Sequence, residues 1–549
     1  MLTFRACLVT VLMAMSAVAI ARAAWADGLG SQPPGIKPTT ATLSGVISAN
    51  LNARGKALET FTSYVLDYSY SAGGFLGKTD TIAVGRDYLT TDTYGPFTDL
   101  AGRLNGQYWT QNENGLTVAL SGLRGRADMN RLAIKALEGG ATVDAARLLG
   151  ETSSPVAAYV VEVHPQEGLL EWRFYGVKSG LLVRDETFDG RFRTVRTYDD
   201  FRDTKGAVLA WHYHVTDGDL TNDEDWKVSK LDVNVPVSLN DLNIRQDARA
   251  LVEFPVGKES VELPMRVVDG HIITRLFING KGYDFMLDSG AGGIFIDRGL
   301  LADLGLKRYG RINATAAGQF ELVRSIVPEI HFGDLTMRNV AVYGIPFRGN
   351  VRADTKINGL VGFDFIADCV LKIDYDKQKM VAIKPDAFQM PADALGQMPI
   401  TLDSSVPEVR AGIGGAYDDH FIVDTGAGDV VVFSKFSLAH PQETSDLGRG
   451  RAEAKAINGL GFGDLLFAGG VGGSFRVWPT EIEKFSFGPV NFVNWVIEKT
   501  DPNEGLDDGE HDGLIGYTFL RLFTIYFDYN RSRMILAPNG LYRSVTHTG

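Results

Sequence analysis

The second half of the chain contains three sequence blocks that occur twice in the same order. The blocks of the first copy are Phe285–Gly292, Asn358–Phe363 and Asp374–Val381, and those of the second copy are Phe421–Gly428, Asp512–Tyr517 and Asp528–Ile535. The second and third blocks are separated by the same number of residues in both copies. Three matching blocks in one order indicate an internal duplication, so this half is predicted to fold as two similar lobes.

The first block of each copy leads from an apolar segment through an aspartate into a turn of small residues. The two aspartates are Asp288 and Asp424. On its own, one Asp-Ser/Thr-Gly segment is typical of an ordinary aspartate turn. Two lobes related by a pseudo-twofold axis would instead bring both carboxylates to that axis. Adjacent carboxylates share one proton, so one can act as a general base on a water while the other acts as a general acid.

The duplicated blocks resemble the signature of aspartic peptidases, and in particular of the retropepsin-like branch. That signature is a hydrophobic residue followed by Asp-Thr/Ser-Gly-Ala, with two hydrophobic residues and a glycine further on, here Leu360–Gly362 and Leu514–Gly516. The resemblance covers roughly Val261–Pro538. It implies a mainly β fold in which two tandem β-barrel lobes, residues 258–390 and 396–540, form a pseudo-twofold bilobal peptidase.

The resemblance also assigns the site. It makes Asp288 and Asp424 the catalytic pair and implies active-site support from their neighbours, Ser289, Gly290, Thr425 and Gly426. It implies an endopeptidase that acts on polypeptides, needs no metal or other cofactor, and is complete within one chain. Glycine-rich flap hairpins are expected at Tyr309–Gly318 in the first lobe and from Leu447 onward in the second.

Pepsin-like enzymes have a serine after the Asp-Ser/Thr-Gly triplet, whereas this chain has Ala291 and Ala427. A serine hydroxyl can donate a hydrogen bond to the ionised carboxylate and lower its pKa, and alanine cannot. The sequence therefore predicts a pair of aspartates that works at weakly acidic rather than strongly acidic pH.

The first half of the chain has no such blocks. Residues 45–247 contain segments with the alternation of β-strands and one helical stretch, Ala127–Leu149. They predict a β-rich domain with a helical insertion. The succession of short segments between Trp172 and Arg202 resembles that of the periplasmic lipoprotein-carrier half-barrel family. The change of pattern near Arg245–Val256 predicts that this domain can be separated from the lobes.

The first residues have the pattern of a secretory signal peptide, over residues 1–26. Arg5 precedes an apolar run, Ala6–Ile20, and two Ala-x-Ala cleavage sites follow it. An uncleaved membrane anchor is the alternative, but a run of about 15 residues is shorter than the roughly 20 needed to span a bilayer. We therefore expect residues 27–44 to be a linker, and the mature protein to be periplasmic or secreted, without an integral membrane segment.

The net charge, the cysteine and a pair of histidines bear on other classes of function that the chain could have. A net charge of −13 disfavours nucleic-acid binding, because such a surface repels phosphates. Cys369 lies in an apolar run and is predicted to be a core residue rather than a nucleophile. His212 and His214 share one strand face, but without a third ligand nearby an ordinary strand face is favoured over a metal site.

Two functions remain open from the sequence. The first is the aspartic endopeptidase. The alternative is a non-catalytic periplasmic protein that binds a peptide, a lipid or a lipoprotein with degenerate peptidase lobes. A decayed enzyme usually loses one aspartate, and the presence of both Asp288 and Asp424 favours the enzyme.

Overall fold

The structure is a computed structural model of the 549-residue chain. It describes residues 35–120, 146–163, 170–189, 192–242, 250–315, 319–347, 350–352, 355–402, 405–445, 468–470, 473–502, 506–507 and 511–546. The expected signal peptide and the first part of the expected linker lie outside the described residues. So do residues 127–145 of the expected helical insertion and the segment 447–467, where the second flap is expected.

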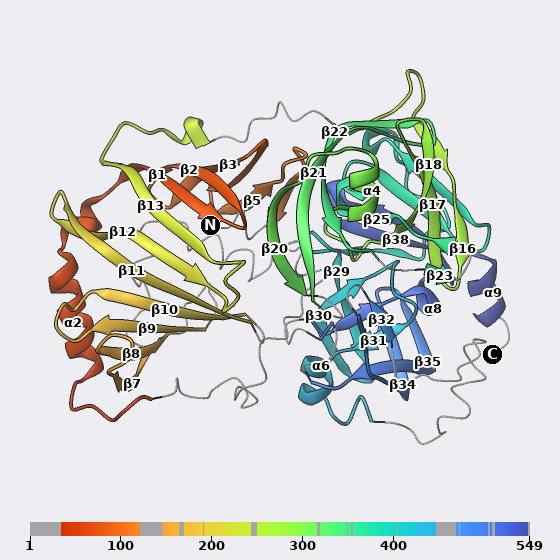
Figure 1. Cartoon of the computed structure of the whole chain (residues 1–549). Coiled ribbons are helices and arrows are strands. Elements are labelled where there is room, and N and C mark those ends of the chain that lie inside the picture. Colours follow the sequence, from red (N-terminus) through yellow and green to blue (C-terminus); the bar gives the residue numbers. More distant parts are fainter. Residues whose placement is uncertain are drawn as a thin grey trace.

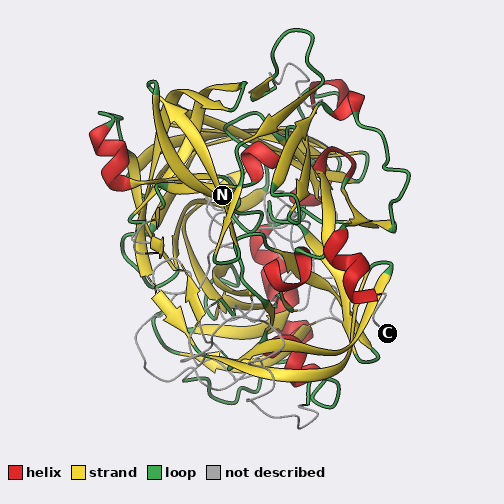
Figure 2. Cartoon of the chain, turned by 90° about the vertical axis from the view of Figure 1, so that its right-hand side faces the viewer, coloured by secondary structure: helices red, strands yellow, loops and turns green. Residues whose placement is uncertain are grey.

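The described chain is mainly β, as the sequence predicts (Figure 1). Figure 2 shows the same predominance of strands, with short helices set among them. An N-terminal sheet forms one half of the molecule, and two lobes built from the duplicated segments form the other half (Figure 1).

The N-terminal sheet has thirteen antiparallel strands in the order β6-β5-β4-β3-β2-β1-β13-β12-β11-β10-β9-β8-β7. Helix α2 lies along one end of this sheet, against β7 and β12 (Figure 1). The strands are β1 Ser63–Ala72, β2 Phe75–Val84, β3 Asp87–Tyr94, β4 Phe97–Leu104, β5 Gln107–Gln111, β6 Thr117–Leu120, β7 Ala146–Thr152, β8 Ala158–Val163, β9 Glu171–Gly176, β10 Leu182–Asp189, β11 Phe192–Thr204, β12 Ala207–Thr216 and β13 Glu224–Val233. The helical elements are the α-helix α2 Leu43–Arg54 and the short 3-10 helices η1 Ala57–Thr60 and η4 Leu239–Leu242.

Two local expectations are wrong in this half. The end of the predicted helical stretch, Ala146–Leu149, forms part of strand β7, where it pairs with β8. Its Ala-Arg-Leu-Leu composition favours a helix, but the open edge of β8 supplies backbone partners, and tertiary pairing outweighs propensity. The end of the expected linker is helical, because α2 begins at Leu43 with the Thr42 hydroxyl accepting a hydrogen bond from Gly45 N.

Each lobe closes the same ring of six strands. In the second lobe the ring is a closed barrel in the order β29-β30-β36-β31-β35-β34. In the first lobe β17-β18-β25-β19-β22-β21 follow the same order, and the ring closes because β21 also pairs with β22. Strand β20 extends this sheet beyond β21 as its edge. The pseudo-symmetry read from the sequence is thus present strand by strand.

The strands and helices of the first lobe are β14 Val252–Glu253, β16 Arg266–Val268, β17 His271–Ile278, β18 Lys281–Leu287, β19 Ile294–Asp297, α4 Arg298–Asp303, β20 Tyr309–Thr315, β21 Gln319–Phe332, β22 Leu335–Ile345, β23 Asn350–Arg352, β24 Thr355–Lys356, β25 Gly359–Val361 and α5 Phe363–Ile366. Those of the second are β29 Glu408–Ile413, β30 Ala416–Val423, β31 Val430–Val432, α6 Ser434–Ala439, β32 Ala468–Gly470, β33 Gly473–Phe475, β34 Val477–Phe487, β35 Val490–Thr500, β36 Gly513–Ile515 and α8 Tyr517–Leu520.

A six-stranded sheet joins the lobes in the order β15-β27-β26-β37-β38-β28. Its two central strands, β26 from the first lobe and β37 from the second, pair antiparallel. Each ends at the aspartate that opens the third repeated block, Asp374 or Asp528. This sheet comprises β15 Ser260–Leu263, β26 Val370–Asp374, β27 Lys379–Ile383, β28 Gly396–Pro399, β37 Phe523–Asp528 and β38 Arg533–Pro538; η5 Pro385–Ala387, η6 Tyr529–Arg531 and α9 Gly540–Thr546 complete the elements.

Candidate active site

Parallel strand pairs set the positions of the two aspartates. Strand β18 pairs with β25 in the first lobe, and β30 pairs with β36 in the second. Asp288 N donates to Val361 O at 2.9 Å, and Asp424 N donates to Ile515 O at 3.0 Å. Each aspartate therefore leaves its strand beside the end of the segment that carries the second repeated block.

The glycines of the second block allow this close approach. A Cβ atom on Gly362 would lie 2.0 Å from the carbonyl oxygen of Ala291, and one on Gly516 would lie 2.6 Å from that of Ala427. Both distances are far below van der Waals contact, so only glycine fits. The repeated glycine thus lets the second block reach the aspartate turn in each lobe.

Ser289 and Thr425 brace the two lobes against each other. The Ser289 hydroxyl donates to Val423 O at 2.7 Å and accepts from Thr425 N at 3.0 Å. Reciprocally, the Thr425 hydroxyl donates to Leu287 O at 3.1 Å and accepts from Ser289 N at 2.9 Å. Both side chains are buried. Four hydrogen bonds therefore fix one aspartate turn relative to the other.

The two carboxyl groups lie together, and a glycine from the opposite turn covers each of them. Asp288 and Asp424 are hydrogen-bonded to each other through their side chains. A Cβ on Gly290 would lie 2.7 Å from the Asp424 carboxyl carbon, and one on Gly426 would lie 2.7 Å from that of Asp288. Any side chain at either glycine would displace the facing carboxylate.

The electrostatics of the pair favour one shared proton. Burial, followed by the charge of Asp424, raises the pKa of Asp288 well above its ordinary value. Burial also raises the pKa of Asp424, but the hydrogen bond from Asp288 and the Gly426 and Ala427 N–H groups favour its charged form. Those two N–H groups lie 2.7 and 3.2 Å from Asp424 Oδ1. The backbone N–H groups of Gly290 and Ala291 favour the charged form of Asp288 in the same way, so the two aspartates share one proton and titrate as a pair.

The structure also places residues at the pair that the sequence analysis did not single out. His271, at the start of β17, forms a hydrogen bond with the backbone of Gly426 and interacts with the charge of Asp424. Its burial lowers the pKa of the imidazole. Tyr529, the second residue of a third block, is buried within electrostatic reach of both aspartates, and its counterpart Tyr375 is within reach of Asp424. Because this tyrosine occurs in both copies of the third block, the sequence could have indicated it as a residue near the pair.

The other sequence candidates lie away from the pair. His212 is held between Asp199 and Asp225, with its ring nitrogens 2.6 and 2.8 Å from their carboxylates. Among the described residues, no group of three His, Cys, Asp or Glu side chains is placed to hold a metal ion. Cys369 is fully buried, and burial raises the pKa of its thiol, as suits a core residue. No described helix is long and apolar enough to cross a membrane.

Residues 274–365 match the family model described as "Aspartyl protease". This part of the chain is similar to aspartyl proteases. The aspartyl-protease-like segment includes Asp288, its turn and Gly362, which are the residues that build the first half of the pair. No curated protein sequence matches the chain.

Three solved structures are similar to part of the chain. A DUF1329 family protein from Desulfovibrio piger is 16% identical over 37% of this chain and 97% of its own, with a TM-score of 0.28. A putative outer membrane lipoprotein-sorting protein domain from Vibrio parahaemolyticus is 11% identical over 36% and 94%, with a TM-score of 0.27. A LolA superfamily protein from Nitrosomonas europaea is 13% identical over 37% and 99%, with a TM-score of 0.29.

Proposed function

We propose that this protein is an exported aspartic endopeptidase in which Asp288 and Asp424 activate a water to hydrolyse peptide bonds. One observation carries the proposal: the two carboxyl groups are hydrogen-bonded to each other at the junction of two lobes with matching strands. Because both aspartates come from one chain, a monomer contains the whole pair. The division into domains at residues 45–247, 258–390 and 396–540 is part of the proposal.

The proposed reaction takes Asp424 as the ionised aspartate and Asp288 as the protonated one. The Asp424 carboxylate accepts a proton from the water, whose oxygen bonds to the carbonyl carbon of the substrate. Asp288 donates its proton to the carbonyl oxygen, which forms a neutral tetrahedral intermediate. As the intermediate collapses, Asp424 gives its proton to the leaving nitrogen, the C–N bond breaks, and Asp288 regains a proton from the hydroxyl group.

The test is peptide hydrolysis by Asp288→Asn, Asp424→Asn and the double variant, measured on a peptide library. Each single change should abolish activity, and the double variant should be hardly worse, because the pair acts as a unit. Asp303→Asn, a matched change at an exposed site on α4, should retain full activity. Substantial activity in either single variant would contradict the mechanism.

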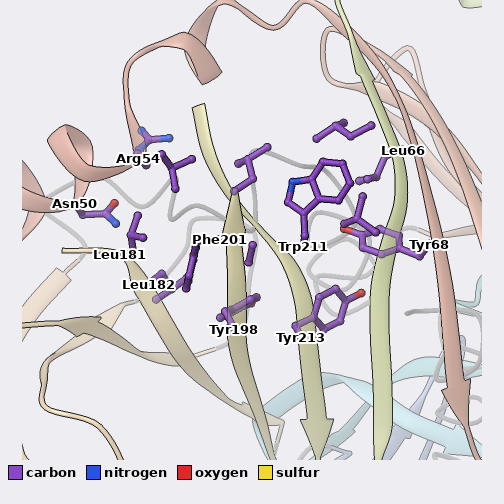
Figure 3. Close-up of a pocket in the computed structure, with 15 residues that line it drawn as sticks. Asn50, Arg54, Leu66, Tyr68, Leu181, Leu182, Tyr198, Phe201, Trp211 and Tyr213 are labelled. Carbon is purple, nitrogen blue, oxygen red and sulfur yellow. The ribbon is translucent and has the colours of Figure 1, made fainter. Parts of the chain in front are cut away.

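A second candidate function is supported by the N-terminal sheet, which contains an apolar pocket (Figure 3). Helix α2 and strands β1, β10, β11, β12 and β13 line it, with Tyr68, Tyr198, Trp211 and Tyr213 among the lining side chains. Such a lining suits an apolar ligand. Binding of a fluorescent fatty acid should be lost when Ala210→Trp fills the pocket and retained in Ala302→Trp, an exposed control on α4. Equal binding by both variants would remove this function.

A further inference from the structure

Strand β20 of the first lobe lies between the lobes and the N-terminal sheet (Figure 1). Its residues belong to the segment Tyr309–Gly318, where the peptidase resemblance implies a flap hairpin, and it pairs with β21 on one side only. An unpaired strand edge leaves backbone N–H and C=O groups without partners. In this chain the N-terminal half supplies those partners.

The loop between β12 and β13 takes the place of a neighbouring strand. Asn222 Nδ2 donates to Asn313 O at 2.9 Å, and Asn222 Oδ1 accepts from Asn313 N at 2.9 Å. The Asn313 side chain in turn donates to Asp219 Oδ2 at 2.9 Å. One asparagine side chain thus brackets the backbone of one β20 residue.

The β1–β2 turn holds the other end of β20. Arg311 N donates to Gly73 O at 2.6 Å. The ring of Phe75 covers Gly310 so closely that a Cβ there would lie 2.0 Å from it. Tyr309 packs edge-on against Phe97 of β4, with ring centroids 5.5 Å apart. Three separate parts of the N-terminal sheet therefore contact this short strand.

The same surface continues onto β21, β22 and the aspartate loop. Arg324 of β21 is buried, donates to Tyr94 Oη at 2.8 Å and forms an ion pair with Glu113. Asn114 binds the backbone of Ala341 in the same way as Asn222 binds that of Asn313. Asn114 Oδ1 accepts from Ala341 N at 2.8 Å, and Asn114 Nδ2 donates to Ala341 O at 3.0 Å. Asn112 donates to Asp364, which also accepts from Ile294 N, just beyond the Asp288 turn.

We propose that the N-terminal sheet holds β20 in place for substrate binding, with Asn222 and Asp219 as positioning residues. The functional part of this inference rests on the proposed peptidase function. A strand already ordered by its neighbours loses little conformational freedom when substrate binds, so pre-organisation improves affinity. Release of β20 should therefore weaken substrate binding and leave the hydrolytic step itself unchanged.

The physical claim is tested by hydrogen exchange on the full chain. Amides of β20 should exchange about threefold to tenfold faster in Asn222→Ala than in the wild type, the effect of losing one or two hydrogen bonds. Asn222→Asp, which keeps the acceptor for Asn313 N and loses the donor, should lie between them. Phe75→Leu, at the separate β1–β2 contact, should also accelerate exchange. Asn52→Ala, exposed on α2, is the matched control. Unchanged protection in both Asn222→Ala and Phe75→Leu would overturn the inference.

The functional claim is tested by steady-state kinetics on a cleaved peptide. Asn222→Ala should raise KM about threefold to tenfold with kcat unchanged within about a factor of two, and Asn222→Asp should recover part of the loss. A fall in kcat with KM unchanged would overturn the positioning role. If the wild type cleaves no peptide, the proposed function fails and the positioning role fails with it, while the exchange result still decides whether the sheet holds β20.

Discussion

Ser289 and Thr425 make the four hydrogen bonds that fix the aspartate turns across the lobe junction. Ser289→Ala should leave Val423 O and Thr425 N buried without their partners, and each such loss costs about 1–3 kcal/mol. We expect the free energy of unfolding, measured in urea, to fall by about 2 kcal/mol or more, and kcat to fall with it. Thr425→Ser keeps the hydroxyl and is the matched control. Equal stability of Ser289→Ala and the wild type would contradict the brace.

Ala291 and Ala427 belong to the backbone cradles of the two carboxylates, and they set the expected pH range. The Ala427 N–H lies 3.2 Å from Asp424 Oδ1, and the Ala291 N–H bonds Asp288. A serine hydroxyl at either position would donate to the ionised form, at about 1.5–3 kcal/mol for a bond to a charged group, where one pKa unit is about 1.36 kcal/mol. The acid limb of kcat/KM should therefore move down by about one to two pH units in the Ala291→Ser/Ala427→Ser variant.

The control for this profile is Ala302→Ser, an exposed change on α4. Burial raises the pKa of both aspartates, so the wild-type profile should be centred at weakly acidic pH and report the pair rather than either residue. A serine variant whose profile stays in place, or moves upward, would show that the alanines do not set it.

Repetition decided which individual site residues could be predicted. The aspartates, their hydroxyl neighbours and their glycines occur twice, and the structure brings all of them to one place. His271 has no counterpart in the second lobe. Counting from the paired strands, the equivalent position there is occupied by Val406. Nothing in the sequence near His271 indicates that its strand begins beside Asp424, so only the fold reveals this contact.

At the element scale, strand β35 carries a buried acid whose titration should affect stability. Burial and the nearby Asp429 raise the pKa of Glu498 from 4.5 to about 8. The folded state therefore binds a proton more tightly than the unfolded state, and the stability this gives is lost as pH rises from about 4.5 to about 8. Glu498→Gln, uncharged and similar in shape, should show a smaller fall in Tm between pH 5 and pH 8 than the wild type.

Glu483→Gln, exposed on the neighbouring strand β34, is the matched control and should follow the wild type. Parallel Tm curves for Glu498→Gln and the wild type over this range would mean that Glu498 is ionised in the folded barrel.

Elements were predictable where local pattern and tertiary pairing agree. The strands that deliver Asp288 and Asp424 end in the apolar segments Phe285–Leu287 and Phe421–Val423, which are largely buried, and small residues follow each aspartate. The segment Ala146–Leu149 reads as a helix because its residues favour one, yet it forms an edge strand. Its partner, β8, lies further along the chain, and a local composition window contains no information about that edge.

At the scale of the whole molecule, the sequence predicts a separable N-terminal domain, and the contacts argue against easy separation. Asn112, Asn114 and Asn222 occupy turn-like segments, where asparagine is ordinary for local reasons. Asn112 does cap its own turn, because its Oδ1 accepts from Asn114 N and Leu116 N. Each of the three also binds lobe backbone or an active-site neighbour more than 90 residues away in sequence. Such pairings have no sequence signature, because either partner alone is explained by its own turn or strand.

Those contacts should keep the N-terminal sheet on the lobes even when the chain between them is cut. If residues 243–249 are replaced by a site for a specific protease and the chain is cut there, the two pieces should stay together on size-exclusion chromatography. The ion pair of Arg324 with Glu113 is buried in the contact, with both side chains less than 5% exposed, so salt should screen it little. Association should therefore survive about 0.5 M NaCl.

Arg324→Met combined with Asn114→Ala should weaken this association, because Glu113 then remains buried without that partner. Asn52→Ala should have no effect. Separation of the wild-type pieces after cutting would show that the covalent link, and not this interface, keeps the N-terminal sheet on the lobes.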